Sequence, residues 1–237
     1  MPMVGLGCYG ISNRSIIEDA LENGYRHFDT ANFQENETEL GLEVHDYMFM
    51  NAFHRQDYFI TSKVHSKDLD FERAYNSIDV SLEATKLGYI DNMLLLWPGS
   101  MHVDESNPKN IANRHAAWRA LEKGVEERKL AGAGVSNFNI HHLEKLMQAS
   151  DMKPTVNQIE IHPLHCEDNL VEFCRENDIV VQGYAPFAGG DERLLNNVTL
   201  NAIADRNEVT VHQLILLWHL QKGFGVLPNS TKSHRQQ

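Results

Sequence analysis

The sequence predicts a closed parallel (β/α)8 barrel whose eighth helix is missing. First, eight strand-like runs recur along the chain, and most of them are short, apolar and bounded by Gly, Pro, Asn or Asp, as buried parallel strands are. Second, segments with helical spacing of apolar residues separate these runs, and eight βα steps favour a closed barrel over an open sheet. Third, only residues 231–237 follow the eighth run, too few for another barrel helix.

The strands are predicted from runs that are too short for helices and rich in apolar residues. In chain order they are Met3–Leu6, Tyr25–Thr30, Tyr58–Val64, Met93–Trp97, Gly132–Ser136, Val156–Ile161, Ile179–Tyr184 and Gly225–Leu227.

The helices are predicted from capping residues and from apolar side chains that recur on one face. The first is expected to begin after a cap at Ser12 or Asn13 and to end at Gly24, which can adopt the left-handed conformation of a helix end. The later ones are expected at Phe71–Leu87, Asn110–Lys129, Ile140–Gln148, Glu167–Glu176 and Leu200–Lys222, the last broken near Asn207.

Length and charge limit the possible classes of protein. Residues 1–237 are predicted to form a single domain, because α/β barrels of this length do. A formal net charge of −12 argues against nucleic acid or an anionic membrane as partner, since phosphates attract clustered Lys and Arg. No apolar run reaches the roughly 18 residues of a membrane-spanning helix, and no secretory signal is recognisable at the start.

Cysteine and histidine usage predicts neither disulfides nor a metal site. The 3 cysteines are widely spaced, which suits a reducing compartment, and the cytoplasm is the expected location. The 13 histidines invite a metal hypothesis. The densest cluster, residues 162–166, lacks a second matched pair of ligands, so no metal is expected.

Residues 5–10 also match the G-x-G-x-x-G pattern of dinucleotide-binding folds, with Asp29 at the distance of a ribose-binding carboxylate. Very little chain precedes Gly5, however, so a full first strand of that fold cannot form. The many further βα steps also do not fit it. The pattern is therefore interpreted as the first strand and turn of the barrel.

Two segments carry a resemblance to a known family. Residues 29–37 read Asp-Thr-Ala-Asn-Phe-Gln-Glu-Asn-Glu, and residues 91–98 read Asp-Asn-Met-Leu-Leu-Leu-Trp-Pro. They resemble the aldo-keto reductase patterns Asp-Thr-Ala-x-x-Tyr-x-Asn-Glu and Asp-Leu-x-Leu-x-His-Trp-Pro. Further matches stand at Gly24–Ala31, Phe59–Lys63, Gly134–Phe138, Asn157–Pro163 and Tyr184–Pro186. The resemblance implies hydride transfer from a nicotinamide to a carbonyl carbon.

Carried over residue by residue, the resemblance gives Asp29 and Lys63 as the retained catalytic aspartate and lysine. The family's tyrosine acid falls on Gln34, and its carbonyl-orienting histidine falls on Leu96. A glutamine amide donates hydrogen bonds but has no proton to transfer near neutral pH, and a leucine side chain offers neither donor nor acceptor. A structural alternative for Asp29 and Lys63 is a buried ion pair retained for stability alone.

The resemblance also implies a nicotinamide nucleotide site, with NADP(H) as the possible cofactor. The residues at matching positions are Ser136, Asn137, Gln158 and Tyr184 for the nicotinamide, with Ser230 and Arg235 for the phosphate end. The family's usual phosphate-binding lysine falls on Asn229, so weakened binding at that end is expected. The C-terminal loop that shapes the family's substrate pocket is expected to be missing.

Two interpretations of function remain open at this stage. In the first, the chain is a catalytically impaired homologue that serves as a structural or regulatory subunit. A protein partner would then cover the apolar flank left open by the missing helix, since large exposed apolar patches mark such interfaces. In the second, the chain is an NAD(P)(H)-dependent reductase of aldehydes or ketones.

Overall fold

The computed structural model describes residues 1–236 and contains one sheet of eight parallel strands in sequential order. The strands are β1 (Leu6–Gly7), β2 (His27–Asp29), β3 (Phe59–Val64), β4 (Asn92–Leu95), β5 (Ala133–Ser136), β6 (Val156–Glu160), β7 (Val180–Tyr184) and β8 (Gly225–Leu227). The sheet closes on itself, because the Gly5 and Gly7 N–H groups donate to the Val226 and Pro228 carbonyls at 3.0 and 2.9 Å. The predicted parallel barrel is confirmed.

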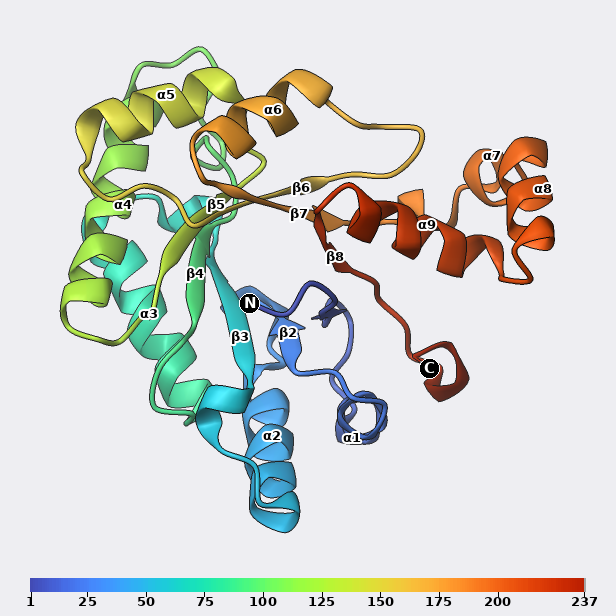
Figure 1. Cartoon of the computed structure of the whole chain (residues 1–237). Helices are drawn as coiled ribbons and strands as arrows, with labels where there is room; N and C mark the ends of the chain where they lie inside the picture. Colours follow the sequence, from blue (N-terminus) through green and yellow to red (C-terminus); the bar gives the residue numbers. More distant parts are fainter. Residues whose placement is uncertain (237) are drawn as a thin grey trace.

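The helices lie outside the strands, and α7 and α8 stand away from them at the right of Figure 1. They are α1 (Arg14–Glu22), α2 (Glu37–Asn51), α3 (Phe71–Thr85), α4 (Lys109–Glu126), α5 (Ile140–Ala149), α6 (Asp168–Glu176), α7 (Glu192–Leu195), α8 (Val198–Arg206) and α9 (Val211–Gln221). The predicted cap at Asn13 and the predicted break near Asn207 are both confirmed. None of the helices in residues 1–236 has the length and apolar character needed to cross a bilayer.

The expectation that the chain lacks its eighth helix is not supported, because the described residues include both α8 and α9. Both helices precede β8. After β8 the described residues form a short 3-10 turn, η5 (Ser233–Arg235). The buried Gln236 side chain donates to the Ile16 carbonyl at 3.4 Å, which ties this segment to α1. The protein partner expected on this flank stays a prediction, as does the assignment of residues 1–237 to a single domain.

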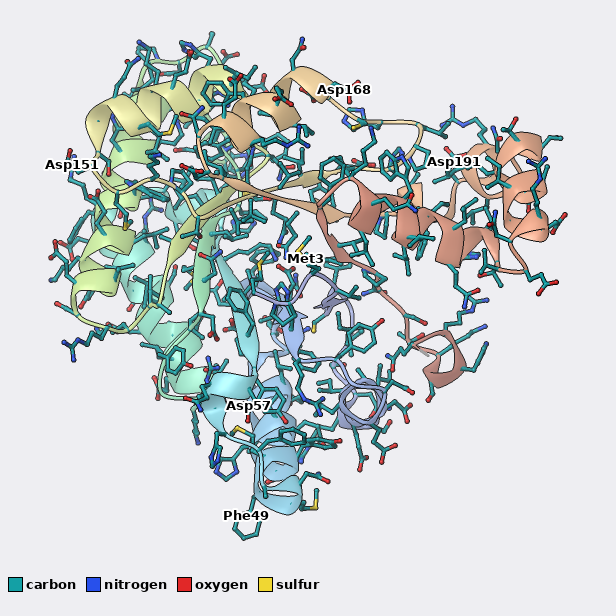
Figure 2. The ribbon with its side chains drawn as sticks, viewed as in Figure 1. Met3, Phe49, Asp57, Asp151, Asp168 and Asp191 are labelled. Carbon is teal, nitrogen blue, oxygen red and sulfur yellow. The ribbon has the colours of Figure 1, made fainter. Side chains whose placement is uncertain are left out.

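The spacing of apolar residues did not predict helix α2, because the buried face of this helix carries acidic side chains. Glu37 accepts a hydrogen bond from the Ser62 hydroxyl at 2.5 Å, and Glu43 accepts one from the Arg14 guanidinium at 2.7 Å. Both partners come from other elements, so the local pattern does not reveal the burial. Figure 2 shows Phe49 at the outer end of α2, pointing away from the fold, where its side chain is 86% exposed.

Candidate functional site

The centre of the candidate site is a buried ion pair at the carboxyl ends of β2 and β3. The two strands pair in parallel with Asp29 opposite Thr61, and Lys63 follows on the same side of β3 two residues later. The Lys63 ammonium donates to Asp29 Oδ1 and, at 3.0 Å, to the Thr30 carbonyl. The side chains of Lys63 and Asp29 are 5% and 9% exposed, respectively. An ammonium carries three N–H groups, so one remains beyond these two partners.

The second oxygen of Asp29 is held from the opposite side of the barrel. Gln158 on β6 donates from Nε2 to Asp29 Oδ2 at 2.6 Å and to Gln182 Oε1 on β7 at 2.8 Å. The structure therefore joins Gln158, predicted as a nicotinamide ligand, to the predicted catalytic pair. Sequence reasoning missed Gln182, whose position on a buried strand gives no chemical signal by itself. Because both carboxylate oxygens accept hydrogen bonds, the buried charge of Asp29 is well compensated.

Three further predicted residues meet at the ends of β5 and β7. The Ser136 hydroxyl donates to the Gln158 carbonyl at 2.9 Å, and the Tyr184 hydroxyl donates to Asn137 Oδ1 at 2.9 Å. Asn137 has a φ of 63°, in the left-handed region where Asn is favoured among non-glycine residues. Its Nδ2 donates to the Leu96 carbonyl at 3.0 Å, which ties the loop after β5 to the end of β4.

A cavity of about 240 Å³ opens beside these residues, with Trp97, Asn137 and Tyr184 in its lining. The Tyr184 ring is half-buried, and its burial raises the pKa of the hydroxyl, which stays protonated to bond Asn137. One flat ring beside amide and hydroxyl groups suits a planar heteroaromatic ring with a carboxamide substituent. The residues present therefore fit a nicotinamide.

The residues at the expected acid and orienting positions lie on the same rim but supply no acid. Gln34 ends the 3-10 turn η1 (Asn32–Gln34) directly after β2, and its Oε1 is buried with no hydrogen-bond partner among the described residues. Leu96 follows β4 and offers the site only its carbonyl, which Asn137 already occupies. That these two positions correspond to the family's tyrosine and histidine stays a prediction.

The expected phosphate end lies after β8, on a segment separate from the Asp29 cluster. The Asn229 amide donates to the carbonyls of Gly7 and Tyr9, at 2.7 Å each, and so fastens this segment to the turn after β1. The Ser230 hydroxyl accepts from the Lys232 N–H at 3.1 Å. Lys232 and Arg235 are both exposed cations here, and sequence reasoning missed Lys232. The weakening of this end stays a prediction.

Among residues 1–236, no group of three or more His, Cys, Asp or Glu side chains is arranged to hold a metal ion.

His65 lies just past β3, two residues beyond Lys63, and its ring contacts Phe33 in η1. Sequence reasoning did not single it out, although the spacing of two from Lys63 along a strand is a usable signal.

Comparison with known proteins gives consistent similarities over nearly the whole chain. The model of a family described as "Aldo/keto reductase family" matches residues 12–237. Glyoxal reductase of Bacillus subtilis (strain 168) is 36% identical over 99% of this chain and 80% of its own length. Glycerol 2-dehydrogenase (NADP(+)) of Hypocrea jecorina is 35% identical over 99% of this chain and 82% of its own length.

Solved structures agree with these relatives. The crystal structure of MGS-M4, an aldo-keto reductase enzyme from a Medee basin deep-sea metagenome library, has a TM-score of 0.90 to this chain at 32% identity. It is matched over 100% of this chain and 83% of its own. The aldose reductase of Schistosoma japonicum gives a TM-score of 0.89 at 28% identity, over 100% of this chain and 81% of its own.

Proposed function

Because the chain belongs to the aldo/keto reductase family, we propose that it is an oxidoreductase that reduces an aldehyde or ketone to an alcohol with a nicotinamide nucleotide. The observation that carries this proposal is the buried Asp29–Lys63 pair, which keeps one N–H of the ammonium unused at the carboxyl ends of the strands. Active sites of (β/α)8 barrels lie at this end. The catalytically impaired subunit has no support beyond the identities of Gln34 and Leu96, whereas relatives are named as reductases and dehydrogenases.

NADP(H) is the proposed nucleotide, since one relative carries NADP(+) in its name. When bound, it supplies the hydride that adds to the carbonyl carbon. Ser136, Asn137 and Gln158 would hold the carboxamide, and the Tyr184 ring would lie against the nicotinamide. At the other end, the exposed cations Lys232 and Arg235, with Ser230, would bind phosphate.

Lys63 is the proposed source of the proton. Hydride addition turns the carbonyl oxygen into an alkoxide, and the unused N–H of the ammonium gives its proton to that oxygen. The resulting amine stays bonded to Asp29 and regains a proton from solvent. A positioned general acid is worth roughly 10²–10⁴-fold in rate. Gln34 cannot act in this way, because an amide holds no acidic proton near neutral pH.

The test is consumption of NADPH or NADH by the purified protein with glyoxal and with 4-nitrobenzaldehyde. Lys63→Met should lower kcat at least about 10²-fold. Lys153→Met, which removes an exposed lysine at 55% side-chain exposure, should leave it unchanged. Quenching of tryptophan fluorescence by each nucleotide measures binding separately. Saturable binding without turnover would refute the reductase and favour the impaired homologue, and absence of both would refute the nucleotide site as well.

A gain-of-function variant probes the two positions that lack an acid. Gln34→Tyr combined with Leu96→His should raise kcat by roughly 10²-fold or more if the rest of the site is intact. The paired single variants separate the effect of the acid from that of the orienting group. No gain in a correctly folded double variant would mean that other parts of the site also limit the reaction.

A further inference from the structure

We propose that His65 is a further catalytic residue, whose Nε2–H donates a hydrogen bond to the carbonyl oxygen of the substrate. This inference rests on the proposed reductase function. It places at the end of β3 a hydrogen-bond donor for the carbonyl. The Leu96 side chain, after β4, cannot supply such a donor. Three features of the structure carry it: the direction of the side chain, its contact with η1, and the ring nitrogen that is free to donate.

The backbone of β3 directs His65 to the same side as Lys63. Val64 is fully buried on the opposite side of the strand, and His65 continues the extended conformation with φ −70° and ψ 151°. Side chains alternate along an extended strand, so Lys63 and His65 share one face with Cα atoms about 7 Å apart. The Lys63 face is the one that holds Asp29, so the imidazole lies on the same face as the ion pair, further toward the carboxyl end of β3.

The ring of His65 is fixed against the segment that follows β2. Its centroid lies 4.8 Å from that of Phe33, with an interplanar angle of 68°. Phe33 is the central residue of η1, next to Gln34. The imidazole therefore lies between the segments that follow β2 and β3, and in the proposed reaction the substrate carbonyl binds between it and Lys63.

A backbone hydrogen bond selects the tautomer. The Lys67 N–H donates to His65 Nδ1 at 3.1 Å, so Nδ1 carries no proton and Nε2 carries it. No described residue accepts a hydrogen bond from Nε2. Burial lowers the pKa of His65, with the Lys67 ammonium acting in the same direction and Asp68 opposing it. The ring is therefore neutral near pH 7 and donates a hydrogen bond without giving up its proton.

The two hydrogen-bond donors, His65 and Lys63, have different roles in the proposed reaction. As hydride adds to carbon, negative charge develops on the oxygen, where a fixed N–H has its greatest effect. His65 stabilises that charge and orients the carbonyl, while Lys63 transfers the proton. Loss of one such donor from an active site lowers kcat by roughly 10²–10³-fold.

The kinetic test compares two replacements at this position. His65→Phe keeps an aromatic ring against Phe33 but removes the donor, so kcat should fall roughly 10²–10³-fold while nucleotide affinity is unchanged. His65→Gln retains an N–H donor and should keep most of the activity. His45→Gln serves as the matched control, since that side chain is 67% exposed. A His65→Phe variant with the kcat of the unaltered protein would overturn the inference.

A second measurement does not depend on turnover. In the NADP⁺-loaded protein, ¹⁵N NMR should show the Nε2–H tautomer of His65, and 4-nitrobenzaldehyde should shift its resonance. The Nδ1–H tautomer, or no response to the aldehyde, would overturn the inference. A shifted resonance in a protein without turnover would refute the reductase function but not the carbonyl contact. Normal turnover in His65→Phe would refute the role of His65 alone.

Discussion

Removing the carboxylate of Asp29 should destabilise the fold far more than removing one member of a solvent-exposed ion pair does. In Asp29→Ala, the Lys63 ammonium stays at 5% side-chain exposure without its counter-charge. The Gln158 amide also loses an acceptor at 2.6 Å. Breaking a buried pair from one side costs about 3–5 kcal/mol. With a urea dependence of about 2 kcal/mol per molar, the unfolding midpoint should fall by about 1.5–2.5 M.

The assay is urea unfolding followed by tryptophan fluorescence, with two matched variants. Glu172→Ala breaks an exposed i,i+3 pair with Arg175, whose side chains are 59% and 58% exposed. It should cost less than about 1 kcal/mol. Asp29→Asn combined with Lys63→Met removes both charges and should be more stable than Asp29→Ala, because no charge is left unpaired. Equal midpoints for Asp29→Ala and Glu172→Ala would refute the buried pair.

Three other predictions concern separate parts of the molecule. Burial lowers the pKa of His27 from 6.5 to about 4, so the unfolded chain binds the extra proton first as pH falls. The free energy of unfolding should then fall between pH 6.5 and pH 4 by up to about 1.4 kcal/mol per pH unit. Urea midpoints should show a weaker fall in His27→Gln. Gly41→Ala places a Cβ 2.1 Å from a backbone oxygen of α3 and should cost about 1–3 kcal/mol. Gly99→Ala, in which the nearest atom to the new Cβ is 3.7 Å away, should be nearly neutral when both variants are compared by urea unfolding. Lys232→Gln and Arg235→Gln should each weaken NADPH binding about two- to fivefold and NADH binding less, by fluorescence titration. Equal losses for both nucleotides would contradict contact with the 2′-phosphate.

The pattern of the sequence predicted the barrel well because its strands are buried on both faces. The runs predicted at Tyr58–Val64 and Val156–Ile161 are short and begin with apolar residues, and the structure has strands there at Phe59–Val64 and Val156–Glu160. Helix α2 could not be predicted in this way, since Glu37 and Glu43 occupy buried positions that polarity alone would place in solvent. Their partners, Ser62 and Arg14, belong to other elements.

The sequence by itself determined the order of the eight strands, all the described helices except α2 and α7, and the identities of Asp29 and Lys63 at two neighbouring strand ends. It also placed His65 two residues from Lys63, where strand geometry directs both to one side. Only the tertiary structure decided that Gln158 bonds Asp29, a contact between residues 129 apart in the chain. It also decided which nitrogen of His65 donates, through the Lys67 N–H. The spacing of apolar residues in the sequence reveals the period of a strand or a helix. Hydrogen-bond partners on distant strands are fixed only when the closed barrel brings those strands together.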